Sequence, residues 1–240
     1  MASPARPTAP PAAAPATPIR RSGPRPGRRQ AWQVWALYVV GFVPAVWTFY
    51  LGATDQLGAD PVKSFEHSLG LWALRFLILT LCVTPLREIT GMSLIRYRRA
   101  LGLLAFYYAA MHLSTYLILD QGLDIAAVVA DVLKRLFITI GMAAFVMLIP
   151  LAVTSNGYFI RRLGRNWGRL HKLIYLAAAA GAVHFVMSVK SWPTEPLVYA
   201  GIVAVLLTYR LLRPLWRPKR RGSARQRSAG TPLAGQPRQV

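Results

Sequence analysis

The dominant feature of this 240-residue sequence is a set of six apolar stretches, each long enough to cross a lipid bilayer as a helix. The hydrocarbon core of a bilayer is about 30 Å thick, and about 20 mainly apolar helical residues are needed to cross it. Lipid offers no hydrogen-bond partners to the backbone, so such segments fold as helices. We expect an all-α bundle of six transmembrane helices, with spans near residues 32–51, 69–86, 100–119, 132–153, 170–189 and 197–212.

The composition agrees with a membrane protein and argues against other classes. Hydrophobic residues make up 54% of the chain and charged residues only 15%, although the net charge is +21. This apolar content excludes a disordered chain, and the long apolar runs argue against a nucleic-acid-binding domain. The basic runs are expected to be topology signals near anionic lipid headgroups, with a docking role as the secondary reading. The single cysteine, Cys82, excludes a disulfide framework and a thiolate iron–sulfur cluster.

Basic tails flank the apolar region. Residues 1–30 hold eight prolines and six arginines, and residues 214–240 are rich in Arg, Pro, Gly and Ser. Such compositions are typical of disordered segments. We therefore expect disordered tails at residues 1–30 and 214–240 around a six-helix domain at residues 31–213.

The charges separate onto two sides of the expected bundle. Four segments that alternate with the spans, and so share one side, hold 24 of the 29 Lys and Arg residues. The opposite side carries seven of the eight acidic residues. By the positive-inside rule, both termini are expected in the cytoplasm.

Two histidines fall inside the apolar spans, where ionisable groups are costly and therefore suggest function. His112 lies about 18 Å along its helix from Ala100, and His184 lies about 19.5 Å along its helix from His171. The two imidazoles are thus expected at similar depth in the outer half of the bilayer. Neutral imidazoles there could hold the iron of a haem between helices, beside the small residues 177–182. The alternative is that each histidine is a structural hydrogen-bonding group.

His171 and Arg75 are further candidates. His171 follows the basic stretch 161–169 at the start of the fifth span. It could ligate a second haem, touch a quinone or flavin, or extend to the headgroups. Arg75 lies about 9 Å into the second span and could neutralise haem propionates, or reach the outer headgroups.

The histidine pattern, the segment R-x-x-W-x-x-L-H-K-L-I-Y around His171, and the segment from Arg96 to His112 resemble one known family. The resemblance covers about residues 32–213. It is to the haem-binding membrane subunits of the bacterial protein-methionine-sulfoxide reductase system, the MsrQ or YedZ type. These belong to the wider ferric-reductase-like transmembrane group. The oxidases of that group carry two histidines on each of two helices, whereas the third span here has only His112, so one haem is expected.

The resemblance implies an electron-transfer subunit in the bacterial inner membrane. It implies b-type haem held by His112 and His184, an FMN contribution, and a quinone pool or a cytoplasmic flavin reductase as donor. The implied acceptor is a periplasmic molybdopterin-containing enzyme that repairs oxidised methionines. No G-x-G-x-x-G, P-loop or H-E-x-x-H motif is present, so we expect no substrate-reducing site in this chain. The alternative function is a small transporter or proton channel that uses the membrane histidines as a relay.

Overall fold

The structure is a computed structural model that describes residues 28–189 and 194–216, and within these residues it is helical without strands. Six helical segments are long and apolar enough to cross a membrane: Ala31–Ala53, Pro61–Thr90, Ile95–Asp120, Leu136–Val153, Arg165–Ser188 and Thr194–Pro214. The predicted all-α, six-helix membrane fold is therefore confirmed. The tails expected at residues 1–30 and 214–240 lie outside the described residues, except for residues 28–30 and 214–216.

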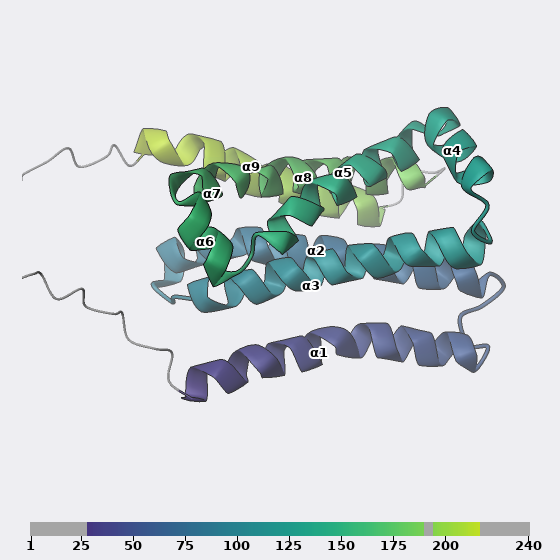
Figure 1. The fold of residues 1–240 in the computed structure, drawn as a ribbon, viewed down its shortest axis with the longest axis horizontal. Helices are drawn as coiled ribbons and strands as arrows, with labels where there is room; N and C mark the ends of the chain where they lie inside the picture. The colour runs from purple at the N-terminus through teal and green to yellow at the C-terminus, as the bar shows by residue number, and fades with distance from the viewer. Residues whose placement is uncertain (1–27, 190–193, 217–240) are drawn as a thin grey trace, which may run out of the picture.

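The long helices run side by side along one axis, and the short helices lie at the two ends of the bundle (Figure 1). In chain order, the helices are α1 (Arg28–Ala53), α2 (Pro61–Thr90), α3 (Ile95–Thr115), the π-helical turn η1 (Tyr116–Asp120), α4 (Ile125–Lys134), α5 (Leu136–Val153), α6 (Gly157–Leu163), α7 (Arg165–Leu170), α8 (Leu173–Ser188) and α9 (Thr194–Trp216).

Helix α2 is longer than the span expected at residues 69–86, because strong end signals lie well outside its apolar part. Its first turn is capped by the side chain of Asp60, which accepts a hydrogen bond of 3.0 Å from the N–H of Lys63. Pro61 stands at the first helical position, where its missing N–H costs nothing. The helix ends at Gly91, which takes the left-handed conformation with φ 73°.

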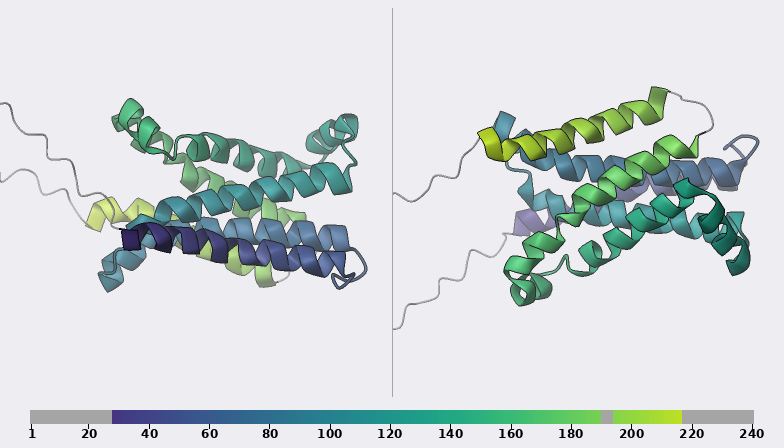
Figure 2. Two further views of the ribbon diagram at one scale, coloured as in Figure 1. Left: turned by 60° about the horizontal axis from the view of Figure 1, so that its bottom comes forward. Right: turned by 90° about the horizontal axis from the view of Figure 1, so that it is seen from above.

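The fourth span differs from the expectation of a helix from residue 132. Arg135 is extended, with φ −113° and ψ 97°, and separates α4 from α5. Helix α4 lies across one end of the bundle (Figure 2). Its exposed residues Ile125, Val129 and Leu133 are spaced by four and form one apolar face, the pattern of a helix lying in a membrane surface. Apolar content alone did not distinguish this surface helix from the start of α5.

Two helix pairs form the centre of the bundle: α2 packs along α3, and α5 packs along α8. Helix α9 packs on α8, and α1 packs against α2 and α3. The most buried positions of this core include Leu104, Ala105 and Tyr108 of α3 and Ala177 and Ala178 of α8, all with no exposed surface. The small residues among them, Ala105, Ala177 and Ala178, allow close approach of the helix backbones.

The Tyr108 side chain joins α3 to α1 through a polar contact in the core. Its hydroxyl donates a hydrogen bond of 2.7 Å to the carbonyl of Gly41 and accepts one of 3.0 Å from the N–H of Ala45. These backbone groups belong to residues four apart in α1, next to Pro44. Proline disturbs the regular hydrogen bonding of a helix, and an inserted side chain can restore it. Tyr108 therefore supports α1 at its proline.

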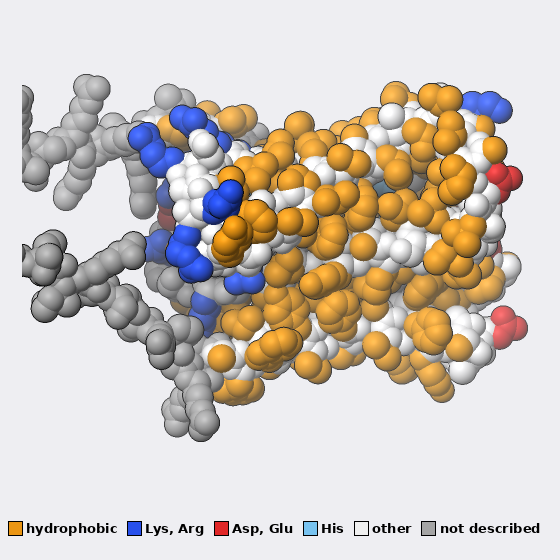
Figure 3. Space-filling model, viewed as in Figure 1, with side chains coloured by type: hydrophobic (Ala, Val, Ile, Leu, Met, Phe, Trp, Pro, Cys, Tyr) orange, Lys and Arg blue, Asp and Glu red, His pale blue; other side chains and the backbone are white. Residues whose placement is uncertain are grey.

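Charged side chains gather at the two ends of the molecule, with a hydrophobic belt between them (Figure 3). One end holds the Lys and Arg side chains of α3, α6 and α7, and we call it the basic end. The other, the acidic end, carries the acidic residues Asp55, Asp60, Asp120, Asp124 and Glu195 of the turns and helix ends. The start of α1 and the end of α9 both lie at the basic end, as six crossings require (Figure 1).

Candidate functional site: a histidine pair between two helix pairs

The two histidines predicted to share a depth are close neighbours in the structure. His112 of α3 and His184 of α8 have ring centroids 6.2 Å apart, with their planes inclined by 74°. They come from the two central helix pairs, so the site lies where α2–α3 meets α5–α8.

Each imidazole is held by the backbone of a neighbouring helix. Nδ1 of His112 lies 2.9 Å from the carbonyl oxygen of Glu66 in α2, and Nδ1 of His184 lies 2.7 Å from that of Phe137 in α5. A carbonyl oxygen only accepts hydrogen bonds, so each Nδ1 must carry the proton. This fixes the neutral tautomer and leaves the lone pair of Nε2 for a ligand. Neither Nε2 is hydrogen-bonded to another described residue.

Two glycines let the rings reach these carbonyls. A Cβ atom at Gly70 would lie 3.1 Å from the ring of His112, and one at Gly141 would lie 2.7 Å from Nδ1 of His184. Each glycine follows the accepting carbonyl by four residues, on the same helix face. We call each set of histidine, carbonyl and glycine a cradle: the first is His112, Glu66 and Gly70, and the second is His184, Phe137 and Gly141.

The spacing of the rings fits a metal between them. A metal–imidazole bond is about 2 Å long and a ring nitrogen lies about 1.1 Å from its ring centre, so two imidazoles on opposite sides of one metal have centroids about 6 Å apart. Among the described residues, no group of three or more His, Cys, Asp or Glu side chains could hold a bare ion. The pair therefore suits a metal that brings further ligands of its own, as the iron of a haem does.

Arg75 of α2 points toward α9. Its Nε donates a hydrogen bond of 2.7 Å to the hydroxyl of Tyr199, and its guanidinium carbon lies 4.8 Å from the ring centroid of Trp72. Its Nη2 is 3.9 Å from a carboxylate oxygen of Glu195, at the outer limit of an ion pair. The guanidinium therefore keeps donors for a further anionic group.

His171 lies apart from the pair, between α7 and α8 at the basic end. Its ring stacks on Trp167 with centroids 4.0 Å apart, and its Nε2 lies 3.1 Å from the hydroxyl oxygen of Thr154. That hydroxyl donates its only hydrogen bond to the carbonyl oxygen of Pro150, at 2.6 Å. The Thr154 oxygen must then accept from His171, which places the proton on Nε2 and leaves Nδ1 as the free lone pair. This is the opposite tautomer to that of the histidine pair.

The predicted site residues thus form three separate groups. The backbone carbonyls and glycines that hold the histidine pair were not predicted from the sequence. His112 and His184 come together, whereas Arg75 joins Tyr199 and His171 joins Thr154. Some of the small residues at 177–182 serve helix packing, because Ala177, Ala178 and Ala182 are buried in the core. Nothing in the sequence distinguishes the two cradle glycines from glycines that serve helix packing.

Comparison with known proteins adds a family. Residues 69–182 match the family described as ferric reductase like transmembrane component. The matched segment contains Gly70, His112, Gly141 and His171, and it ends two residues before His184.

Similarity over most of the chain is found with three Brucella proteins that share one name, "Protein-methionine-sulfoxide reductase heme-binding subunit MsrQ". The protein of Brucella anthropi is 68% identical over 190 residues, which cover 79% of this chain and 85% of the relative. Those of Brucella ovis and Brucella canis are each 65% identical over 201 residues, which cover 84% of this chain and 90% of the relative.

Proposed function

The chain belongs to the MsrQ family of haem-binding subunits of protein-methionine-sulfoxide reductases, and on this basis we propose that it carries electrons across a membrane through a b-type haem held by His112 and His184. The observation that carries the proposal is the paired cradle arrangement, which presents two Nε2 lone pairs from rings 6.2 Å apart. Haem iron bound in this way supplies one-electron chemistry, and two axial histidines suit it to electron transfer.

The protein's own groups orient and insulate the site. The Glu66 and Phe137 carbonyls fix both ring tautomers and restrict ring rotation, as outer-shell partners of metal-binding histidines do. The free donors of Arg75, in the half of the molecule toward the acidic end, would pair with the haem propionates.

We propose that electrons enter at the basic end and leave at the acidic end, to a separate methionine-sulfoxide reductase. In the bacterial inner membrane, the basic end would face the cytoplasm and the acidic end the periplasm. The acceptor would be a periplasmic molybdopterin enzyme. The donor would be the quinone pool or a cytoplasmic flavin reductase. This chain would act as the electron-transfer subunit, and reduction of the oxidised methionine would take place on the partner.

The basic end offers a place for the FMN that the resemblance implies. A hollow of about 420 Å³ is lined by Leu163, Arg165, Asn166 and Arg169. Two guanidinium groups there suit a phosphate, which arginine binds through paired hydrogen bonds. His171, just after α7, lies next to this segment along the chain. We therefore assign it to the route by which electrons enter at the basic end.

The test is haem binding by His112→Ala and His184→Ala. We expect each variant to insert into membranes but to lose the six-coordinate haem spectrum, because one imidazole cannot complete the ligand set. Tyr158→Ala, at an exposed aromatic side chain of α6, is the control and should keep the full spectrum. A six-coordinate spectrum retained in either test variant would refute the pairing. Wild-type protein that takes up no haem when haem is supplied would favour the transporter or proton-relay alternative.

A further inference from the structure

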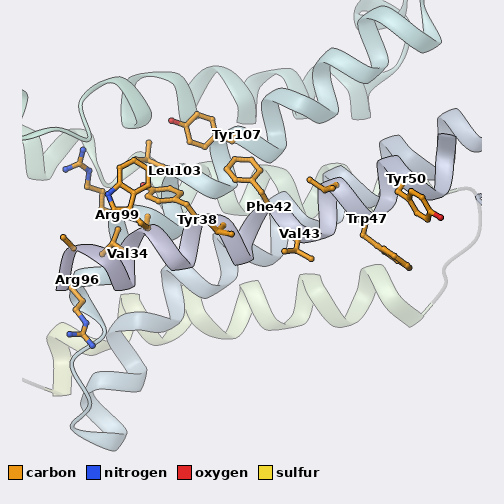
Figure 4. A pocket seen from close by; sticks show the side chains of 15 residues that line it. Val34, Tyr38, Phe42, Val43, Trp47, Tyr50, Arg96, Arg99, Leu103 and Tyr107 are labelled. Atoms are coloured by element: carbon orange, nitrogen blue, oxygen red, sulfur yellow. The ribbon is translucent and has the colours of Figure 1, made fainter. Parts of the chain in front are cut away.

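A long groove runs along the outside of the bundle between α1 and α3 (Figure 4). Its volume is about 1470 Å³, larger than the about 300–1,000 Å³ of typical small-molecule pockets. The wall is mainly aromatic and aliphatic, with Phe42, Val43 and Trp47 among its residues, and the groove is open along its side. In a membrane this opening faces the lipid, so a lipid-soluble molecule can enter from the bilayer.

Most polar side chains of the groove lie nearer the basic end, while Tyr50 lies at its other end (Figure 4). Arg99 lines its mouth, and Tyr38 and Tyr107 lie farther in on the two walls. The Tyr107 hydroxyl points back toward the end that Arg99 occupies (Figure 4). Neither tyrosine hydroxyl is hydrogen-bonded to another described residue. Tyr107 lies about 12 Å along α3 from Arg99. Hydroxyls without partners are costly in hydrocarbon, so these groups fit an occupant with polar oxygens at this depth.

The groove is too long for a lipid confined to one leaflet. Its wall on α1 extends from Ala31 to Tyr50, a rise of nineteen residues or about 28 Å of helix. One leaflet provides about 15 Å of hydrocarbon, half the thickness of the bilayer core. An occupant with a polar ring at the tyrosines and a long flexible apolar tail would fill the groove past the midplane.

Aromatic rings connect this groove to the histidine pair. Phe42, in the groove wall, stacks on Tyr108 with centroids 6.0 Å apart, and Tyr108 lies 6.4 Å from Trp72 of α2. Tyr108 also lies one helical turn before His112 on α3, so the two side chains share one face of that helix. A continuous packed path therefore leads from the groove to the first cradle. A redox-active occupant of the groove would have this path to the histidine pair.

We propose that the α1–α3 groove binds an isoprenoid quinol and is the site where this donor delivers its electrons, an inference that rests on the proposed function. Its ring oxygens would pair with Tyr38, Tyr107 and Arg99, and its tail would lie along Val43 and Trp47. Oxidation of the quinol breaks its two O–H bonds and gives the quinone. A haem held by His112 and His184 would take these electrons one at a time and pass the first to the methionine-sulfoxide reductase, or haems in two copies of the protein would take one each. The two protons would go to water at the basic end.

The experiment uses the full-length, haem-loaded protein in lipid nanodiscs. Val43→Trp fills the groove, and Val205→Trp places the same bulk on an exposed position of α9 as the matched control. We expect Val43→Trp to slow haem reduction by decylubiquinol about tenfold or more in stopped flow. Haem content, spectrum and reduction by dithionite should match those of the wild type, and Val205→Trp should behave as the wild type does. An unchanged rate for Val43→Trp would overturn the proposal.

Photolabelling provides a readout that needs no electron transfer. An azido-quinone analogue should label peptides from residues 31–50 and 96–107, and Val43→Trp should remove this label. Labelling elsewhere, or displacement of the label by anionic phospholipid but not by decylubiquinol, would overturn the proposal, the latter in favour of a lipid site. The labelling works equally on protein without haem. Failure of the haem assignment is therefore distinguishable from failure of the quinol site.

Discussion

At the scale of single residues, the cradles show how a backbone can orient a side chain from a different helix. Each imidazole is directed by a carbonyl that its own helix does not supply, with a glycine beside it to admit the ring. A side chain added at either glycine would push the ring away from its carbonyl. The two sites differ in the room they leave, which makes them separately testable.

Gly141→Ala is expected to cost the protein most of its six-coordinate haem, and Gly70→Ala to cost less. The added methyl would lie 2.7 Å from Nδ1 of His184 in the first variant, a distance that real contacts do not reach. In the second it would lie 3.1 Å from the ring of His112, where a small shift relieves it. Haem stoichiometry and visible spectra of the purified variants give the measurement.

Gly201→Ala is the control for both glycines, because nothing lies within 4 Å of a Cβ atom at that position of α9. It should keep the wild-type haem content. Equal haem content in Gly141→Ala and Gly201→Ala would contradict the role given to the second cradle.

His171 also belongs to this scale. We expect His171→Ala to keep the haem held by the histidine pair but to slow its reduction by a cytoplasmic flavin donor, because the change removes the ring stacked on Trp167 at the entry route. Stopped-flow reduction at matched haem content is the measurement. Tyr158→Phe, at an exposed position of α6, is the control. A wild-type rate in His171→Ala would return this residue to a structural role with Thr154.

At the scale of elements, the joint between α1 and α3 depends on one hydroxyl. Tyr108→Phe leaves the Gly41 carbonyl and the Ala45 N–H without the bridging group in a buried place. Loss of a buried hydrogen-bond partner costs about 1–3 kcal/mol. We expect a lower Tm in thermal unfolding of the detergent-solubilised protein. Tyr158→Phe again serves as the control, and a Tm equal to that of the control would show that the bridge does not stabilise the joint.

The elements also show what the sequence can and cannot predict. Hydropathy located the six spans because each must fill the bilayer, and helical rise put His112 and His184 at one depth because both helices begin at the same end. The helix break at Arg135 was not predicted, because α4 is as apolar as the start of a membrane span. The cradle carbonyls were not predicted either. They depend on the register between helices whose contacting residues are 46 and 47 positions apart, and one sequence does not encode that register in any local pattern.

At the scale of the whole molecule, the separation of charge predicts the orientation in the membrane. A reporter fused after Val240 should be active only in the form that works in the cytoplasm, and one inserted near Asp124 only in the form that works outside. The physical reason is the concentration of Lys and Arg on one side, which the positive-inside rule keeps in the cytoplasm. The reverse pattern of activities would reverse the proposed direction of electron flow.

The position of the histidine pair between two helix pairs has a consequence for assembly. One imidazole is anchored on α2 and the other on α5, so a cofactor bound by both would clasp α2–α3 to α5–α8. Ligands that bind only the native state stabilise it by mass action. Haem supply would then govern how much of this protein survives quality control in the membrane. In a haem-starved cell its abundance would fall before any electron transfer was attempted.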